Sequence, residues 1–181
     1  MPGRLERWLY RALRIDGLRF KLCRLRWRLR KHKLQFHPSM DKAVGEKTIS
    51  HNLSAFDCNA VFGMARRMSL LLFPTAAVFK DRLNEVKVLV VGPRTEDDIF
   101  WARSLGMFNT IGLDLFSYSP LIQVGDIHDS GIPDRSYDAV LLGWMISYSS
   151  NPRRVVDECL RILKPGGLLG IGIESNSRQK I

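Results

Sequence analysis

Cysteine is scarce in this chain. The 181 residues include three cysteines, Cys23, Cys58 and Cys159, and four histidines. The cysteines are far apart, and they show neither the short spacing of a metal site nor the even number of a disulfide framework. We therefore expect a cytoplasmic protein kept in a reducing environment, with buried thiols and no metal site.

Long hydrophobic runs are also absent. No apolar stretch approaches the roughly 20 residues that a helix needs to span a bilayer. Near the N-terminus, arginines interrupt every run that could serve as the core of a secretory signal. The first serine is Ser39, whereas mitochondrial presequences are usually rich in serine. We expect neither a membrane-spanning helix nor a secretory signal.

Negative charge is rare at the start of the chain. Residues 1–33, which we call the basic arm, hold twelve of the 28 Lys and Arg residues but only two of the 18 Asp and Glu residues. The remaining chain has sixteen of each, so the net charge of +10 belongs to the arm. Leucines and tryptophans recur there at largely helical spacing, and Gly17 allows two shorter helices instead of one. The residues expected to share one broad apolar face are Leu5, Trp8, Leu9, Leu13, Leu18, Leu22, Leu25 and Leu29.

Three kinds of partner suit the basic arm. An anionic membrane surface would attract the arginines and accept Trp8, Leu22 and Trp27, giving a peripheral protein on the inner face of a membrane. The protein's own domain could instead cover the apolar stripe. Nucleic acid is a weaker third alternative, because the rest of the chain is neutral and lacks stacking aromatics. Charge alone does not choose among them.

Residues 34–85 read as a loop followed by helices that pack on the next domain. The first part, 34–50, is rich in turn-forming residues. Ser54 and Asp57 can then cap a helix that ends near Phe73 and Pro74. A short helix over 75–83 is expected to lead into the first strand of the domain.

Residues 86–181 alternate between short apolar strands and amphipathic helices. This alternation predicts an α/β, Rossmann-like domain with a mostly parallel sheet and helices on both faces. Ligands of such sheets bind beyond the carboxyl ends of the strands, beside the first strand. The expected strands are 85–92, 109–114, a short third strand at 121–124, 136–144 and 168–174, and the expected helices are 95–106 and 151–163.

The first strand is followed by one glycine, Gly92, where nucleotide-binding folds carry several. Pro93 removes a backbone N–H, and the acidic run 96–98 would repel a phosphate at the helix start, so a dinucleotide is disfavoured. Asp114 ends the second strand, 22 residues after Gly92. At this spacing a carboxylate reaches the ribose hydroxyls of a bound nucleoside.

An ordered series of short motifs occupies the second half. It comprises Gly125-Asp126, the run from Pro133-Asp134 to Tyr137-Asp138, Asn151-Pro152, and Glu158 and Arg161 followed by Leu163-Lys164-Pro165-Gly166-Gly167. With the strand pattern, residues 86–174 resemble the class I S-adenosylmethionine-dependent methyltransferases.

The resemblance implies S-adenosylmethionine as cofactor and a methyl acceptor that the sequence does not identify. Asp114 would bind the ribose, Asp126 and the Ile127 backbone the adenine, and Arg94 the methionine carboxylate, with an acid of 96–98 at the ammonium. His128 and Tyr148 are the candidate catalytic groups on the acceptor side. The implied cofactor-binding residues are Gly92, Arg94, Asp114, Asp126, Ile127, Gly143 and Trp144.

The chain also departs from the family pattern. Arg94 and Glu96 replace two loop glycines, and Val90 replaces the acid that precedes the first glycine. The link from Asp114 to Asp126 is too short for the usual crossover helix. The last two strands are lacking, so the N-terminal helices or a second subunit, as a homodimer, should cover the sheet edge.

Two functions fit these features. The first is a methyltransferase of unknown acceptor that the basic arm localises. The second is a non-catalytic protein of the same fold, binding or scaffolding at a membrane surface. Because the expected site lies in the neutral half, removal of the arm should leave cofactor affinity nearly unchanged.

Overall fold

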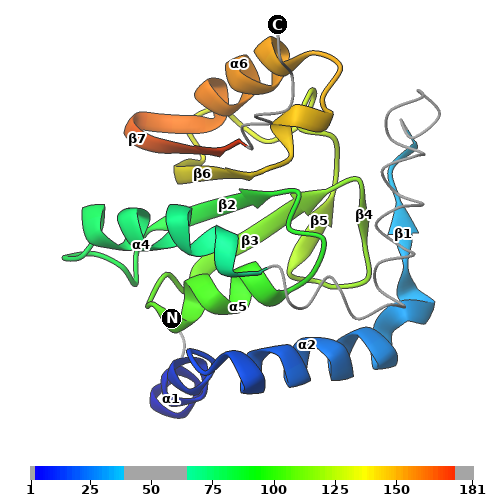
Figure 1. Cartoon of the computed structure of the whole chain (residues 1–181). Helices are drawn as coiled ribbons and strands as arrows, with labels where there is room; N and C mark the ends of the chain where they lie inside the picture. The colour runs from blue at the N-terminus through cyan, green and yellow to red at the C-terminus, as the bar shows by residue number, and fades with distance from the viewer. Residues whose placement is uncertain (1–2, 39–64, 174–181) are drawn as a thin grey trace, which may run out of the picture.

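A five-stranded parallel sheet lies at the centre of the protein (Figure 1). The computed structural model describes residues 3–38 and 65–173. The strand order is β5-β3-β2-β6-β7, and every neighbouring pair is parallel. The strands are β2 (Lys87–Val91), β3 (Asn109–Asp114), β5 (Ile122–Val124), β6 (Tyr137–Gly143) and β7 (Leu163–Gly172). The predicted Rossmann-like α/β fold is confirmed.

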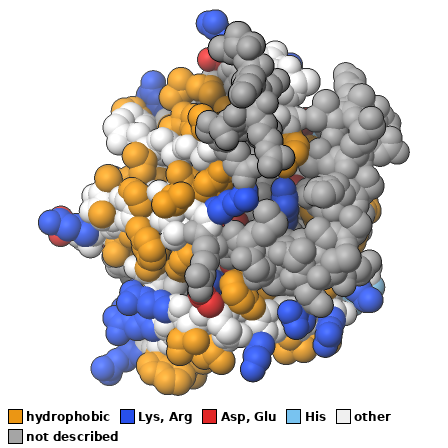
Figure 2. Space-filling model, in the orientation of Figure 1, with side chains coloured by type: hydrophobic (Ala, Val, Ile, Leu, Met, Phe, Trp, Pro, Cys, Tyr) orange, Lys and Arg blue, Asp and Glu red, His pale blue; other side chains and the backbone are white. Residues whose placement is uncertain are grey.

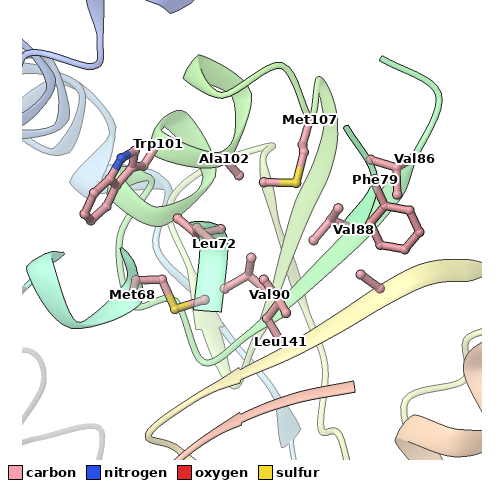
Figure 3. Close-up of a cluster of buried hydrophobic side chains, with 11 residues drawn as sticks. Met68, Leu72, Phe79, Val86, Val88, Val90, Trp101, Ala102, Met107 and Leu141 are labelled. Carbon is pink, nitrogen blue, oxygen red and sulfur yellow. The ribbon is translucent and has the colours of Figure 1, made fainter. Parts of the chain in front are cut away.

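Both faces of the sheet are buried. Along β2, Val88 and Val90 contribute to the core beside α4 (Ser69–Val78) and α5 (Asp97–Ser104). Leu89 and Val91 alternate with them and pack in the core beside α6 (Pro152–Ile162). Figure 3 shows the first of these cores, where side chains from α4 and α5 gather over the sheet. This three-layer arrangement explains why the strand reads as a continuous apolar run.

Helix α6 forms as its sequence predicts. The side chain of Asn151 accepts a hydrogen bond from the Arg154 N–H (3.1 Å), and Pro152 occupies the first helical turn. The boundary at its end differs from the prediction, because β7 begins at Leu163 and includes 164–167 instead of following them. No strand among the described residues pairs with the outer edge of β7, and cover by a second subunit there stays a prediction.

The predicted end of a helix at Phe73 and Pro74 is wrong. Helix α4 follows a 3₁₀ turn, η4 (Ala65–Met68), and continues through Pro74 to Val78, so the separate helix expected over 75–83 does not form. Pro74 has no N–H to donate to the carbonyl of Leu70. Because Leu70 is 68% exposed, water can bind that carbonyl instead. The part of this prediction that concerns 53–64 lies outside the described residues.

No helix connects β3 and β5, as the short link predicted. Residues 115–121 instead contain the two-residue strand β4 (Phe116–Ser117). It pairs antiparallel with β1 (Gln35–Phe36), at the start of the segment predicted to be a loop. The side of the sheet that a crossover helix would cover must therefore be protected by another element.

That element is the basic arm. It forms α1 (Arg4–Ala12), α2 (Asp16–Arg30) and a 3₁₀ turn, η1 (Lys31–Lys33). Helix α2 lies beside α5 and the β3–β5 link (Figure 1). Cys23 of α2 is fully buried in a cluster with Phe100, Phe116 and Tyr118. Packing on the protein's own domain, one of the three alternatives for the arm, therefore applies to α2.

The arm does not present one continuous apolar face. The chain turns at 13–15, before Gly17, and Leu13, Leu22 and Trp27 pack against the domain. Other apolar residues stay on the surface beside basic side chains (Figure 2). The exposed ones are Leu5, Trp8, Leu9, Ile15, Leu18, Leu25 and Leu29. Within the described ranges, no helix combines the length and apolar character needed to cross a bilayer.

Candidate cofactor site

The candidate site lies beside β2, where the order of strands in the sheet changes direction. Strands β3 and β5 lie on one side of β2, and β6 and β7 lie on the other. The loop after β2 begins with Gly92 (φ +69°), and the loop after the neighbouring strand β6 begins near Met145. A Cβ atom on Gly92 would lie 2.9 Å from the Cβ of Met145, so the two loops touch there and the glycine is required. All predicted site residues follow the carboxyl ends of β2, β3, β5 or β6.

Arg94 adopts a left-handed backbone conformation of the kind that favours glycine. Its φ of 54° lies in the left-handed region, which is strained for a residue with a side chain. The Arg94 N–H donates to Oδ2 of Asp114 (3.0 Å), and this bond ties the loop to the end of β3. Both Gly92 and Arg94 therefore have positive φ angles in this loop.

The backbone donors of this loop are committed within the protein. The N–H groups of Gly92, Arg94 and Thr95 donate to the carbonyl of Leu113, the carboxylate of Asp114 and the carbonyl of Pro93. The next two N–H groups, at 96 and 97, donate to Tyr118 Oη and Thr95 Oγ1. Pro93 has none. A pyrophosphate needs several such donors, so this loop is poorly suited to a dinucleotide.

Asp114 is a carboxylate held in place by backbone donors. Burial raises its pKa to about 6, although the N–H groups of Arg94, Leu115 and Phe116 and the Arg94 charge oppose this rise. Asp114 is partly buried at the carboxyl end of β3 and remains ionised at neutral pH. It is thus a fixed hydrogen-bond acceptor of the kind that a ribose diol requires.

Glu96 and Asp97 are not placed to bind an ammonium group of a ligand. The carboxylate of Glu96 accepts two hydrogen bonds from Arg26 (2.5 and 2.6 Å), and Asp97 accepts one from Arg19 (2.8 Å). Asp98, the partly buried third acid, remains the candidate. Burial and the neighbouring Asp97 raise its pKa, while Arg19 and Arg94 lower it.

Thr95 and Asp98 do not form a capping pair at the start of α5. Glu96 is the N-cap residue of α5, and no side-chain hydrogen bond caps the helix. Thr95 Oγ1 accepts instead from the Asp97 N–H (3.2 Å). Helix α5 therefore begins two residues later than the predicted start at 95, and Glu96 and Asp97 at its start bind arginines of α2.

His128 forms the centre of a hydrogen-bonded chain. Its Nδ1 lies 2.6 Å from Oδ1 of Asp126, and its Nε2 lies 2.6 Å from Oγ of Ser149. The Asp126 Oδ1 atom also accepts the His128 N–H (2.9 Å). If Nδ1 carries the proton, Nε2 accepts from the serine hydroxyl. The predicted adenine-binding acid and the predicted catalytic histidine are therefore coupled directly.

The loop that carries Asp126 and His128 is anchored on α6. Glu158 accepts from the Ser130 N–H (3.0 Å) and from Arg161 (2.7 and 2.8 Å), and Arg161 also donates to the Ile132 carbonyl (2.7 Å). The Arg161 and Ser130 hydrogen bonds lower the pKa of Glu158 to about 2. The Glu158 and Arg161 motif positions are therefore structural, since they hold 126–134 in place.

The segment after β6 carries the residues that the sequence predicts for the acceptor side of the site. Trp144 has a φ of 59°, and a Cβ atom on Gly172 would lie 3.0 Å from its ring, so the indole covers the end of β7. Gly143 lies against Met68 of η4. Tyr148, in the 3₁₀ turn η5 (Ile146–Tyr148), is half exposed and adjoins Ser149. The catalytic and binding roles of these residues stay predictions.

Sequence reasoning missed three residues of this region. Arg19 and Arg26 come from the arm, and Ser149 binds the candidate base. The sequence did indicate that Arg19 and Arg26 lie on one face of a helix, because they are seven residues apart and Cys23 lies between them. Their partners, seventy and 78 residues away, could not be identified from that spacing.

The fold is a Rossmann-like α/β domain built on a five-stranded parallel sheet. It is consistent with a class I S-adenosylmethionine-dependent methyltransferase-like domain. Residues 101–171 match the family model of a methyltransferase domain. The match runs from within α5 to β7 and does not include the Gly92 loop. No curated protein matches the chain.

Proposed function

We propose that this protein is an S-adenosylmethionine-dependent methyltransferase whose basic arm attaches it to an anionic membrane surface. The observation that carries the catalytic part is the fixed Asp114 carboxylate beside a loop that keeps its left-handed path at Gly92 and Arg94. The donor set suits a cofactor with ribose hydroxyls and no phosphate. Arg94 offers a cation for the methionine carboxylate.

The cofactor would supply an electrophilic methyl group, and the chain would supply binding, orientation and a route for a proton. Asp114 would bind the ribose diol, and the Asp126–Ile127 segment would bind the adenine. His128 Nε2 would accept a proton from the acceptor through the Ser149 hydroxyl, while Asp126 stabilises the charged imidazole. The acceptor binds near Trp144 and Tyr148 in this proposal.

The Asp114→Asn variant is expected to weaken the binding of S-adenosylhomocysteine by about 1–3 kcal/mol, the scale of a hydrogen bond to a charged group. Wild-type affinity should also fall as the pH drops below the Asp114 pKa of about 6, because the protonated carboxyl accepts fewer hydrogen bonds. Calorimetric titration of the full chain between pH 5 and 8 measures both effects. Equal affinity in a folded Asp114→Asn protein would place the ribose elsewhere.

The alternative, a non-catalytic binding or scaffold protein of this fold, has its own support. The family match excludes the Gly92 loop, and the Asp126 oxygen expected to face adenine already accepts two hydrogen bonds from His128. The same titration separates the two functions. Absence of binding by the wild type at millimolar S-adenosylmethionine and S-adenosylhomocysteine would leave the scaffold function as the better one.

The membrane part of the proposal rests on the outward surface of the arm. Leu5, Trp8 and Leu9 of α1 are 51–73% exposed and lie at helical spacing on one face, while Arg4, Arg7 and Arg11 surround them. Figure 2 shows basic side chains next to apolar ones along this part of the molecule. Such a surface complements anionic headgroups and the acyl boundary beneath them.

Replacing Leu5, Trp8 and Leu9 with serine is expected to abolish sedimentation with liposomes that contain phosphatidylserine, since no apolar side chain of α1 would then insert. The fold should persist, because α1 buries no residue. The residues Leu22 and Trp27, which the sequence marked for insertion, pack inward and are unsuitable for this test. Circular dichroism controls the fold, and unchanged sedimentation would contradict membrane attachment through α1.

A further inference from the structure

Two arginines of the arm reach the start of α5, the helix that follows the loop at residues 92–96, which we call the cofactor loop. Arg19 and Arg26 lie seven residues apart on α2 and bind the adjacent acids Asp97 and Glu96 of α5. The Arg26 pair is bidentate, and the Glu96 side chain is completely buried. A buried bidentate pair of this kind fixes both distance and orientation between the segments that it joins.

Glu96 connects three parts of the chain. Its carboxylate binds Arg26 of α2 and the hydroxyl of Ser119, and its N–H donates to Tyr118 Oη (3.4 Å). Ser119 and Tyr118 belong to the short β3–β5 link. Trp27 of α2 packs edge-on against the Tyr118 ring (4.9 Å between centroids), so the same helix reinforces this link. These contacts meet at the position where the family pattern has its third loop glycine.

We infer that Arg26 is a positioning residue for the cofactor loop: its pair with Glu96 holds residues 92–96 in the path that glycines give elsewhere, so the arm is part of the cofactor site. This inference rests on the proposed function for its ligand. The loop is strained at Arg94, and such a conformation persists only where surrounding contacts enforce it. The earlier expectation that cofactor affinity is independent of the arm is therefore revised.

The chain offers a matched control for Arg26. Arg28 lies on the same helix, carries the same charge and is exposed. Substitution of either residue removes one positive charge from α2, but only Arg26→Ala leaves a buried carboxylate without its bidentate partner. A difference between the two variants therefore reports the contact with Glu96 and not the charge of the arm.

The first readout is the affinity of the full-length protein for S-adenosylhomocysteine, measured by calorimetry well below the melting temperature. We expect Arg26→Ala to weaken binding at least tenfold, Arg26→Lys to be intermediate, and Arg28→Ala to stay within twofold of wild type. Adding Glu96→Gln to Arg26→Ala should recover part of the affinity, because an amide can stay buried beside Ser119 without a counter-charge.

The second readout needs no cofactor. Hydrogen–deuterium exchange at the amides of 92–97 should accelerate at least tenfold in Arg26→Ala and not in Arg28→Ala, whereas peptides from β6 should be unchanged. The inference would be overturned if a folded Arg26→Ala protein with a lower melting temperature kept the affinity and the exchange rates of the wild type. Arg26 would then have a purely stabilising role. If Arg26→Ala does not fold, Arg26→Lys decides in the same way. Failure of the wild type to bind either cofactor form contradicts the proposed function, while the exchange result still judges the positioning of the loop.

Discussion

Replacing Arg19 with methionine is expected to lower the free energy of unfolding by about 3–5 kcal/mol, the range for removing one partner of a buried ion pair. Arg19 is fully buried, and its guanidinium donates to Asp97 (2.8 Å), Asp16 (2.8 Å) and the Leu13 carbonyl (2.9 Å). It also lies over the Trp101 ring, 4.5 Å from the centroid. Without it the buried Asp97 carboxylate has lost its counter-charge.

This loss should depend on pH in a defined direction. Burial raises the pKa of Asp97 to about 6 even with Arg19 present, so the folded state binds a proton more readily than the unfolded state. Ionisation of Asp97 therefore costs stability as the pH rises through about 6, and removal of Arg19 increases that cost. The deficit of Arg19→Met should be largest near pH 8 and should shrink toward pH 4.

Thermal denaturation of the two proteins across this pH range measures the effect. For a chain of this size, 3–5 kcal/mol corresponds to a fall in melting temperature of roughly 6–20 °C. Combining Asp97→Asn with Arg19→Met should restore most of the stability at pH 8, because position 97 then carries no buried carboxylate without a counter-charge. An equal deficit at pH 5 and pH 8 would show that lost packing, and not the uncompensated carboxylate, causes the destabilisation.

Deletion of residues 1–33 is expected to unfold or aggregate the protein. The deletion removes α2, and with it the cover over Phe100, Phe116 and Tyr118 and the counter-charges of two buried acids. Either loss alone is typical of a severely destabilising change. Size-exclusion chromatography and near-UV circular dichroism of the deleted protein provide the measurement.

Deletion of residues 1–9 provides the contrast. It removes the exposed Leu5, Trp8 and Leu9 but keeps Tyr10, whose hydroxyl accepts from Arg103 (2.8 Å), and all of α2. This shorter protein should fold normally and lose only its affinity for anionic liposomes. A soluble, native-like protein lacking all of 1–33 would contradict the structural role assigned to α2.

The central layers could be predicted from the sequence because local patterns determine them. Strands β2 and β6 are largely apolar runs bounded by turns, and β3 is a shorter apolar segment that ends at Asp114. Helix α6 combines an Asn-Pro start with buried residues at helical spacing. The short link between β3 and β5 correctly excluded a crossover helix. The acidic and glycine positions of the candidate site were likewise predicted to lie at one edge of the sheet, where the structure places them.

What could not be predicted depends on contacts between distant segments. Pro74 is tolerated inside α4 because the affected carbonyl belongs to an exposed turn, which no local rule reveals. The basic arm showed an amphipathic pattern, but the pattern does not say which leucines face the domain. From the sequence alone, Glu96 is unfavourable in a loop where the family has glycine. Its partner Arg26 lies seventy residues earlier, so no local pattern indicates the pair.

The position of α2 has a consequence for the order of events during synthesis. Helix α2 leaves the ribosome before the acids and aromatic residues that it covers, which are separated from it by about seventy residues. At about 5–20 residues per second, several seconds pass before its partners are translated. Throughout that interval the helix exposes both its basic and its apolar surface. A nearby anionic bilayer would then compete with the unfinished domain for the same helix, and the partition between the two would be decided before the sheet exists.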